Sequence, residues 1–400
     1  MYNLLDGLRI IEASSFVASP TAGLYCAQFG AEVIRVDQVG GGPDHRRWPV
    51  TEANDSLYWE NLNRAKKSVA LDLTQPQGRE LLQALVRSTG QFITNFPADG
   101  FLSHATLAEG RQDLVTVRVM GWPDGAPALD YTVNNAVGYP MMTGAGPEPV
   151  NHVLPAWDLL SGAYAAFALL AAIRRREQTG LGSEVRIPLS DVAIGTAANL
   201  GGVAEVLHNN ANRSRLGNTV YGLFGRDFVT KDGVRSMIVV VTHRQWANLI
   251  AALGLMDAVG AVEAERGVSF AKDDGLRFEH RDALFPLFET AIGALDHAAM
   301  VTMFDAAGVV HSAYKTMLDA AHDSRLVGDN PIFSASDANP SGLAYPAAGA
   351  FGTIPQMQRA DAKPAPRNGQ HSEEILSEAL GLSSGEIARL IDSGIIGIAK

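Results

Sequence analysis

The chain has 400 residues, of which 46% are hydrophobic and 19% are charged, and its formal net charge is -11. This balance is that of a globular protein, and the length favours two domains. Basic and acidic residues are mixed along the chain with no basic stripe, which argues against a nucleic-acid partner. A local basic pocket for an anionic small molecule remains compatible with an acidic protein.

Three features bear on the compartment. Cys26 is the only cysteine, so no disulfide can form within the chain, and its apolar surroundings predict a buried, inert thiol. Residues 1–9 lack the basic and apolar regions of a signal peptide. The most apolar run, 159–173, has about fifteen residues, which is short for a membrane span and predicts a buried core helix. We therefore expect a cytoplasmic protein without a membrane partner.

The first hundred residues alternate strand and helix patterns. A serine and a proline at 19 and 20 open the first helix, and a glycine at 30 closes it. We expect strands at 8–12, 32–36, 91–96, 114–119 and 184–188, and helices at 20–29, 77–87, 159–176 and 192–207. This rhythm predicts a parallel sheet covered by helices.

The composition changes after residue 208. Residues 209–225 are rich in Asn, Arg and Gly and are expected to form a linker. A second α/β unit should follow, with a strand at 236–241 and helices at 244–253, 283–292 and 297–307. Residues 329–366 are rich in Pro, Gly, Ala and Ser and should form a connecting segment, and the tail at 372–399 should be helical.

Several common catalytic patterns are missing from the sequence. It contains no HExxH motif, no cysteine cluster and no GxSxG elbow, so neither a zinc centre nor a serine hydrolase is expected. Gly40, Gly41 and Gly42 follow a predicted strand but lack GxGxxG spacing, so a glycine turn is favoured over a dinucleotide site.

Asp158 stands directly before the long apolar helix and has two interpretations. It could be the N-cap of that helix. Alternatively, it could be a nucleophile, because amide donors and the dipole at a helix N-terminus should keep its carboxylate ionised. An ionised carboxylate beside Leu154, Pro155 and Trp157 is competent to attack a thioester carbonyl. The residues alone leave both interpretations open.

A basic group also has two interpretations. Arg46, Arg47, Lys66 and Lys67 could form a solvated rim, which is the usual place of such charges. They could instead bind the phosphates or a carboxylate of an anionic ligand such as coenzyme A.

The chain resembles the family III coenzyme A transferases over nearly its whole length. The resemblance rests on several segments that occur in the family's order. They are residues 8–12 with Pro20, 29–37, Asp44 with Arg47, 63–73, 94–97 and 366–376. Any one of these matches is weak evidence for the family, but six matches in the family's order are specific evidence for it.

The resemblance implies roles for particular residues. Asp158 falls at the family's catalytic aspartate and would be the nucleophile that attacks an acyl-CoA thioester. Residues that would contact coenzyme A are Val17, Ala18, Leu71, Asn95 and Phe96. No metal or organic cofactor is implied, since coenzyme A is part of the substrate. Ser103 and Met120 replace a family arginine and lysine, so the diphosphate contacts should differ in detail.

The resemblance also implies an α/β architecture in which both chain ends form one large domain. We expect a Rossmann-like coenzyme A domain from 1–208 and 331–400, a linker at 209–225 and a smaller α/β domain at 226–330. The family forms homodimers whose subunits interlock like rings, which implies a homodimer here.

Subgroups of the family separate on particular residues. Its racemases need a histidine where this chain has Leu129, so an α-carbon proton transfer would lack one base. Residues 130–134, 151–158 and 221–228 are similar instead to members that move coenzyme A between the two carboxyl ends of one branched unsaturated diacid. In that case an arginine, Arg47 or Arg226, would hold the distal carboxylate. Transfer to a separate acid and non-catalytic acyl-CoA binding are the alternatives.

Overall fold

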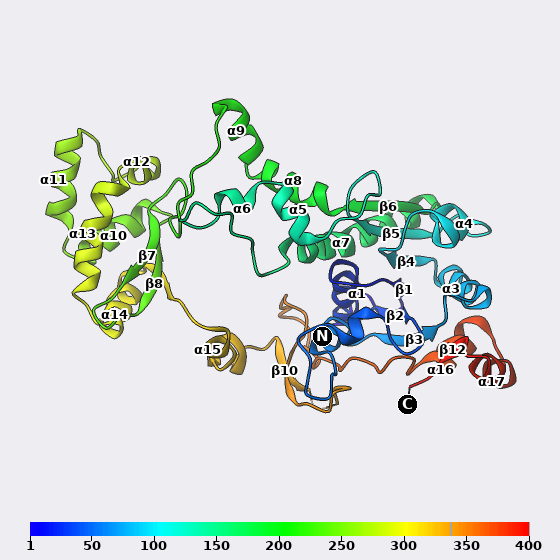
Figure 1. The fold of residues 1–400 in the computed structure, drawn as a ribbon. Helices are drawn as coiled ribbons and strands as arrows, with labels where there is room; N and C mark the ends of the chain where they lie inside the picture. The colour runs from blue at the N-terminus through cyan, green and yellow to red at the C-terminus, as the bar shows by residue number, and fades with distance from the viewer. Residues whose placement is uncertain (337, 400) are drawn as a thin grey trace. The chain divides into compact units, whose positions relative to one another are not determined.

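The computed structural model describes residues 1–336 and 338–399 (Figure 1). They form two compact units: unit 1 is Met1–Gly138, Asn151–Asn210 and Val327–Lys400, and unit 2 is Tyr139–Val150 and Ala211–Leu326. Residues 211–225, which we expected to form a linker, thus belong to unit 2. Tyr139–Val150, which we expected in the large domain, also belongs to unit 2. Arg215 explains why, because its guanidinium donates to the carbonyls of Met141 (2.8 Å) and Gly146 (2.6 Å).

Unit 1 is built on a seven-stranded sheet in the order β12-β3-β2-β1-β4-β5-β6. The strands are β1 (Arg9–Ala13), β2 (Glu32–Asp37), β3 (Lys67–Leu71), β4 (Gln91–Thr94), β5 (Val115–Met120), β6 (Ser183–Pro188) and β12 (Ile396–Gly397). All pairs are parallel except β12 with β3. The expected parallel sheet is confirmed, and its five predicted strands lie within two residues of their expected bounds; β3 and β12 are additional.

The strands carry short apolar runs because both faces of the sheet are covered by helices. The long helices are α1 (Ala18–Gln28), α3 (Pro76–Thr89), α7 (Ala156–Thr179), α8 (Leu189–Asn199), α9 (Gly202–Asn209), α16 (Ser372–Leu380) and α17 (Ser384–Asp392). The β1-α1-β2 and β3-α3-β4 crossovers run in opposite directions along the sheet. Since such crossovers are right-handed, α1 and α3 lie on opposite faces.

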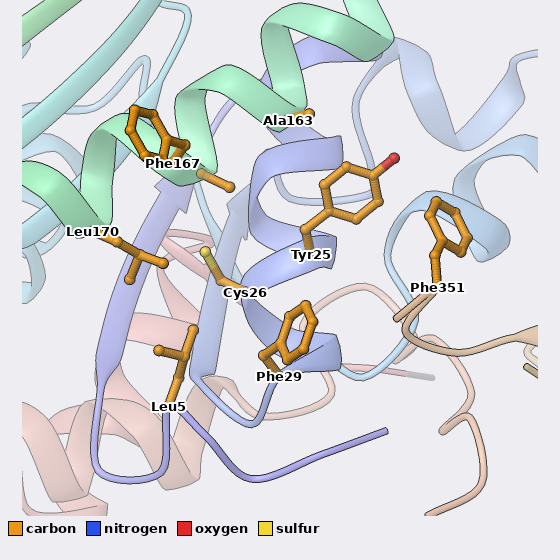
Figure 2. A pocket seen from close by; sticks show the side chains of 9 residues that line it. Leu5, Tyr25, Cys26, Phe29, Ala163, Phe167, Leu170 and Phe351 are labelled. Carbon is orange, nitrogen blue, oxygen red and sulfur yellow. The ribbon is translucent and has the colours of Figure 1, made fainter. Parts of the chain in front are cut away.

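Two core regions result. On the α3 face, Leu82, Leu85 and Val86 pack with α16, α17 and the strands. On the other face, α1 packs against α7, and an apolar cavity of about 260 Å³ lies beside them. Figure 2 shows this cavity, with Tyr25 and Cys26 on α1 and Phe167 and Leu170 on α7.

Short elements complete unit 1. They are η1 (Pro43–Arg46), α2 (Leu57–Leu62), η2 (Gly100–Leu102), α4 (His104–Ala108), α5 (Asp130–Ala136) and the antiparallel pair β10 (Phe333–Ser336) and β11 (Tyr345–Ala348). One expected helix is wrong: residues 192–207 form two helices, α8 and α9. They break at Leu200 and Gly201, where Gly201 has φ +80°, a backbone conformation that ends a helix.

Unit 2 has an antiparallel sheet in the order β7-β8-β9. Its strands are β7 (Gly225–Val229), β8 (Arg235–Val239) and β9 (Val310–Ala313), and its helices are α6 (Tyr139–Met142), α10 (His243–Ala252), α11 (Met256–Arg266), α12 (Asp274–Glu279), α13 (Arg281–Gly293), α14 (His297–Ala307) and α15 (Met317–Ala321). Phe224, Trp246 and Phe288 are at the centre of its core.

Among the described residues, α7 is the single helix with the length and apolarity to cross a membrane, and α13 with α14 would pass the same test as a pair bent by 117°. Core helices also pass such a test. One side of α7 packs on α1, β5 and β6. The expected buried helix is thus confirmed only in part, because Tyr164 and Phe167 on α7 are exposed.

Candidate active site

The sheet order places a topological switch point between β1 and β4. The connection from β1 leads to β2 on one side, and the connection from β4 leads to β5 on the other side. In open α/β sheets, ligands bind outside the carboxyl ends of the strands at such a point. Asn95, directly after β4, joins the two loops: its Oδ1 accepts from the Ser15 amide (3.1 Å) and its Nδ2 donates to the Ser15 carbonyl (2.8 Å).

The residues expected to contact coenzyme A lie mostly around this point. Val17 and Ala18 form the start of α1, where no side chain caps the helix amides. Phe96 follows Asn95 and is 38% exposed. Leu71 differs, because its side chain is fully buried at the end of β3 and belongs to the α3-face core. Any coenzyme A contact at Leu71 would therefore involve its main chain.

The loop after β1 has an unusual backbone. Phe16 has φ +67°, in the left-handed region that phenylalanine rarely occupies. Its amide donates to Asp44 Oδ2 at 2.8 Å, while Asn95 holds the neighbouring Ser15 from the opposite side. A conformation of this kind persists only where its surroundings determine it, and such positions cluster at functional sites.

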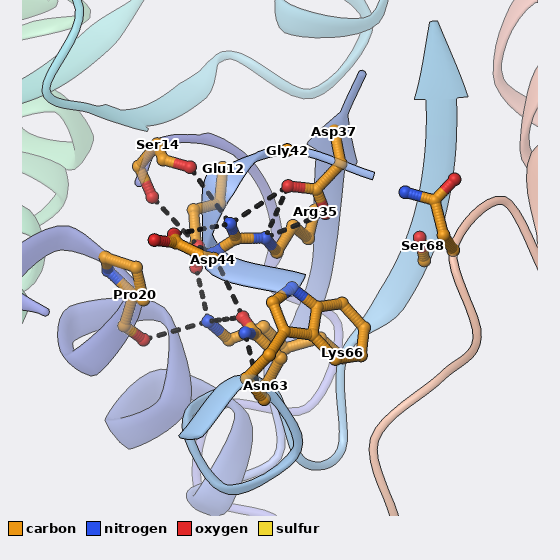
Figure 3. Close-up of polar contacts among 12 residues, drawn as sticks. Glu12, Ser14, Pro20, Arg35, Asp37, Gly42, Asp44, Asn63, Lys66 and Ser68 are labelled. Atoms are coloured by element: carbon orange, nitrogen blue, oxygen red, sulfur yellow. Dashed lines mark hydrogen bonds and ion pairs between the residues drawn. The ribbon is translucent and has the colours of Figure 1, made fainter. Parts of the chain in front are cut away.

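Asp44 belongs to a buried network of charges beneath this loop (Figure 3). Arg35 donates to Glu12 (3.0 Å), to both oxygens of Asp37 and to the Ser14 carbonyl (3.0 Å), and it lies 3.4 Å from Asp44. These acidic groups raise the pKa of Arg35 against the opposing effect of burial. The network thus fixes the acidic side chains that hold the loop.

Lys66 belongs to the same network. It donates to Glu12 (2.8 Å), Asn63 (2.9 Å) and the Pro20 carbonyl (2.8 Å), and its side chain is 0% exposed. Burial lowers its pKa to about 8. The rim interpretation is therefore wrong for Lys66. The rim interpretation agrees with the positions of the other two residues. Arg46 is exposed, and Lys67 pairs with two glutamates at the surface.

Arg47 lies next to the buried network and also reaches solvent. Its side chain is 35% exposed, and its Nε lies 3.5 Å from Asp44 Oδ1. The guanidinium stacks on the Phe16 ring (4.6 Å to the centroid) and on the Tyr58 ring (5.3 Å). Stacking and the ion pair orient a guanidinium whose remaining donors are able to bind an anionic ligand.

Asp158 lies in the first turn of α7 but does not cap it. The N-cap is Pro155, which has no side-chain acceptor, and Asp158 is the third helical residue. The amides of Trp157 (2.7 Å) and Asp158 (3.0 Å) donate instead to Oδ2 of Asp130, from α5. The N-cap interpretation is therefore wrong, and the Asp158 carboxyl is not needed by its own helix.

The electrostatic expectation for Asp158 is also corrected. Burial, followed by the negative charge of Asp130, raises the pKa of Asp158 to about 7, and Arg47 opposes this rise. The sequence predicted a carboxylate kept ionised by helix amides. Those amides are already occupied by Asp130, so they do not stabilise the Asp158 charge. A carboxylate with a pKa near neutrality is a stronger nucleophile when ionised than an ordinary aspartate.

Arg47, Tyr58 and Asp130 thus form a group around Asp158, with which each of them interacts electrostatically. Burial, followed by the negative charges of Asp44 and Asp158, raises the pKa of Tyr58, whose hydroxyl is buried without a hydrogen-bond partner. Sequence reasoning missed Tyr58 and Asp130 as site residues. Asp130 stands next to the position used to argue against a racemase, but nothing in the sequence places it against α7.

His152 is a further residue that the sequence left without a role. Its Nε2 lies 2.5 Å from Asp130 Oδ1, so the segment before α7 brings a histidine into contact with the buried aspartate of α5. Asn134 of α5 accepts from the Trp157 indole (3.1 Å) and donates to Asn151 (2.6 Å). These contacts join α5 to residues 151–158.

Arg226, the second arginine expected at the substrate, lies on β7 of unit 2. Its guanidinium pairs with Glu289 at 2.8 Å and lies over the rings of Phe285 (4.9 Å) and Phe228 (5.4 Å). Arg47, in contrast, belongs to unit 1 with Asp158.

No cluster of His, Cys, Asp and Glu suited to a metal ion occurs among residues 1–336 and 338–399. Cys26 is buried, and burial raises its pKa to about 12, so it is a poor nucleophile.

Residues 5–372 match the family model described as CoA-transferase family III. The chain belongs to this family. It is 44% identical to 2-methylfumaryl-CoA isomerase of Chloroflexus aurantiacus, over 99% of this chain and 98% of that protein. It is 27% identical to succinyl-CoA--D-citramalate CoA-transferase of the same organism, over 96% of each chain.

The fold agrees with this assignment. A crystal structure of a CAIB/BAIF family protein from Brucella suis aligns with a TM-score of 0.77 at 23% identity, covering 95% of this chain and 100% of that one. The mixed α/β architecture with a mainly parallel sheet is thus that of solved family members.

Proposed function

We propose that this CoA-transferase family III protein is a 2-methylfumaryl-CoA isomerase, which moves coenzyme A between the two carboxyl ends of 2-methylfumarate (mesaconate). The observation that carries the proposal is the Asp158 carboxyl, which is free of its own helix and has a pKa of about 7. The 44% identity to an isomerase of that name over nearly the full length supports the choice of substrate.

The proposed reaction begins with attack of the Asp158 carboxylate on the thioester carbonyl. The C–S bond breaks, coenzyme A leaves as thiolate, and a mixed anhydride joins Asp158 to the diacid. The thiolate then attacks the aspartyl carbonyl, which forms aspartyl-CoA and releases the diacid carboxylate within the site. Each step exchanges one activated acyl group for another and needs no external energy source.

Isomerisation requires the diacid to present its other end. That carboxylate attacks the aspartyl thioester, thiolate leaves again, and the thiolate then attacks the substrate-side carbonyl of the new anhydride. The product is the other regioisomer, and Asp158 is regenerated. Retention of the diacid gives it an effective concentration of about 10⁵ M or more when it is well oriented.

We assign Arg47 to the free carboxylate of the substrate, because it is half-exposed, oriented by two aromatic rings and electrostatically coupled to Asp158. The pairing of Arg226 with Glu289 makes it the weaker candidate. We place coenzyme A at the switch point near Val17, Ala18, Asn95 and Phe96. Coenzyme A enters as part of the substrate, and the proposal includes no metal or organic cofactor.

The alternative within the family is transfer to a separate acid, which is the activity that the citramalate transferase is named for. The two functions differ in whether the diacid leaves the site. Purified protein should be incubated with mesaconyl-CoA esterified at one known end, in the presence of ¹³C-labelled free mesaconate. Unlabelled second regioisomer supports the isomerase, labelled product supports intermolecular transfer, and no reaction refutes this substrate.

We also propose a homodimer with interlocked subunits, in the cytoplasm. Unit 1 exposes large apolar side chains on α7 to α9, including Tyr164 (53%), Phe167 (66%), Leu200 (76%) and Leu207 (76%). An exposed surface of this kind indicates an interface. Sedimentation should give twice the mass of 42.5 kDa. A monomer at micromolar concentration, or recovery in the membrane fraction, would refute this part.

A further inference from the structure

The start of α7 depends on an acidic side chain from another element. The first amides of a helix lack partners within it, and a side chain near the N-cap usually accepts from them. Here Asp130 Oδ2 accepts from Trp157 (2.7 Å) and Asp158 (3.0 Å), although Asp130 is 28 residues away from Asp158 in the chain. The charge next to the nucleophile thus belongs to the group that positions the nucleophile's own backbone.

The second oxygen of Asp130 is held as well. His152 Nε2 lies 2.5 Å from Oδ1, and the imidazole is 24% exposed while Asp130 is 2% exposed. The Tyr131 ring lies edge-on to the imidazole at 5.6 Å, and the Trp157 ring lies 6.3 Å from it. His152 therefore reaches solvent with one edge and the buried carboxylate with the other.

We propose that Asp130 and His152 are positioning residues that together control the charge state of Asp158: Asp130 orients the first turn of α7, and the proton on His152 sets how much negative charge Asp158 faces. This inference rests on the proposed function of Asp158. It assigns a role to a histidine that the transfer chemistry itself does not use.

Other charges around Asp158 must be considered for this role. Arg47 opposes the effect of Asp130, and Tyr58 of α2 is coupled to Asp158. The further elements that pack on α7 also carry ionisable groups, namely Tyr25 and Cys26 on α1, Arg118 on β5, Glu184 and Arg186 on β6, and Asp191 on α8. Apart from burial, only the charges of Asp130 and Arg47 shift the pKa of Asp158, so His152 acts through its contact with Asp130.

The arrangement predicts opposite effects for two substitutions. Asp130→Asn keeps an oxygen for the α7 amides but removes the negative charge, so the pKa of Asp158 should fall. His152→Gln keeps a side-chain amide donor for Asp130 but removes the positive charge that a protonated imidazole supplies, so the pKa of Asp158 should rise. If Asp130 and His152 had only structural roles, the two substitutions would not shift the pKa of Asp158 in opposite directions.

The test is a titration of the Asp158 carboxyl by ¹³C NMR in the full-length protein labelled at aspartate, with Asp158→Asn to assign the signal. We expect a fall of about one pH unit in Asp130→Asn, the size typical of a neighbouring charge, and a smaller rise in His152→Gln. Asp191→Asn is the matched control, because Asp191 is also the third residue of its helix but is exposed. It should leave the titration unchanged.

The acid limb of kcat/KM against pH is the second readout and should shift in the same directions. Equal titration midpoints in wild type and Asp130→Asn would overturn the proposal, and an unchanged midpoint in His152→Gln would remove His152 from it. The NMR titration does not need turnover. Inactivity towards every acyl-CoA tested would therefore refute the proposed function, while the titration would still test the effect of Asp130 and His152 on Asp158.

Discussion

Asp158 should cost the protein stability at the pH where it is reactive. Its folded-state pKa is about 7 against an ordinary value of 3.8, mainly because the carboxyl is buried. The folded protein therefore binds this proton more tightly than the unfolded chain does, and stability is lost as pH rises from about 4 to about 7. The difference corresponds to about 4 kcal/mol as an upper limit. Partial solvent access reduces it, so we expect about 1 to 4 kcal/mol.

Replacing the carboxyl by an amide should remove this penalty. Asp158→Asn should be inactive yet more stable than wild type above pH 7, with little difference near pH 4. Urea unfolding followed by circular dichroism at pH 4.5 and 8.5 measures both values, and comparison within one pH cancels other titrations.

The exposed third residue of α8 provides the control, since Asp191→Asn should show no comparable pH-dependent gain. A stability gain for Asp158→Asn that is equal at both pH values would contradict the electrostatic explanation. No gain at pH 8.5 would mean that the carboxyl is better solvated than its burial indicates.

Other expected outcomes follow from the buried contacts. Lys66→Met should lower the free energy of unfolding by about 3 to 5 kcal/mol, because Oε2 of the buried Glu12 loses its cation and only Arg35 still pairs with this carboxylate. Lys67→Met should cost about 1 kcal/mol or less. Equal melting temperatures for the two variants would refute this. Asn95→Leu removes both hydrogen bonds to Ser15. It should raise KM for the acyl-CoA about tenfold, which corresponds to a loss of about 1.4 kcal/mol in binding free energy, with a smaller change in kcat. An unchanged KM would mean that this loop does not contribute to coenzyme A binding.

Much of unit 1 could be predicted from local patterns. The parallel strands are mostly apolar runs bounded by helix signals, because both faces of such a strand are covered by helices. The runs at 8–12 and 32–36 became β1 and β2 for this reason. The family resemblance pointed to Asp158, but the sequence placed this residue before the helix, whereas α7 begins at Ala156 and includes it. Such signals are carried by residues adjacent in the chain.

Contacts between distant segments could not be predicted in this way. Lys66 and Lys67 are adjacent residues of the same type. Lys66 is nevertheless fully buried, whereas Lys67 forms ion pairs at the surface. Their difference depends on Glu12, 54 residues earlier. β12, from the end of the chain, completes the sheet beside β3, and nothing in its two residues indicates that pairing.

The sequence by itself therefore determined the family and the parallel α/β sheet, and it pointed to Asp158 as the proposed nucleophile, since each depends on local pattern or motif. Only the tertiary structure decided the chemistry of Asp158. Its pKa depends on burial and on Asp130, and Asp130 meets α7 because the fold brings α5 against the start of that helix. Electrostatic energies depend on distance in space and on solvent access, and neither quantity is encoded by separation along the chain.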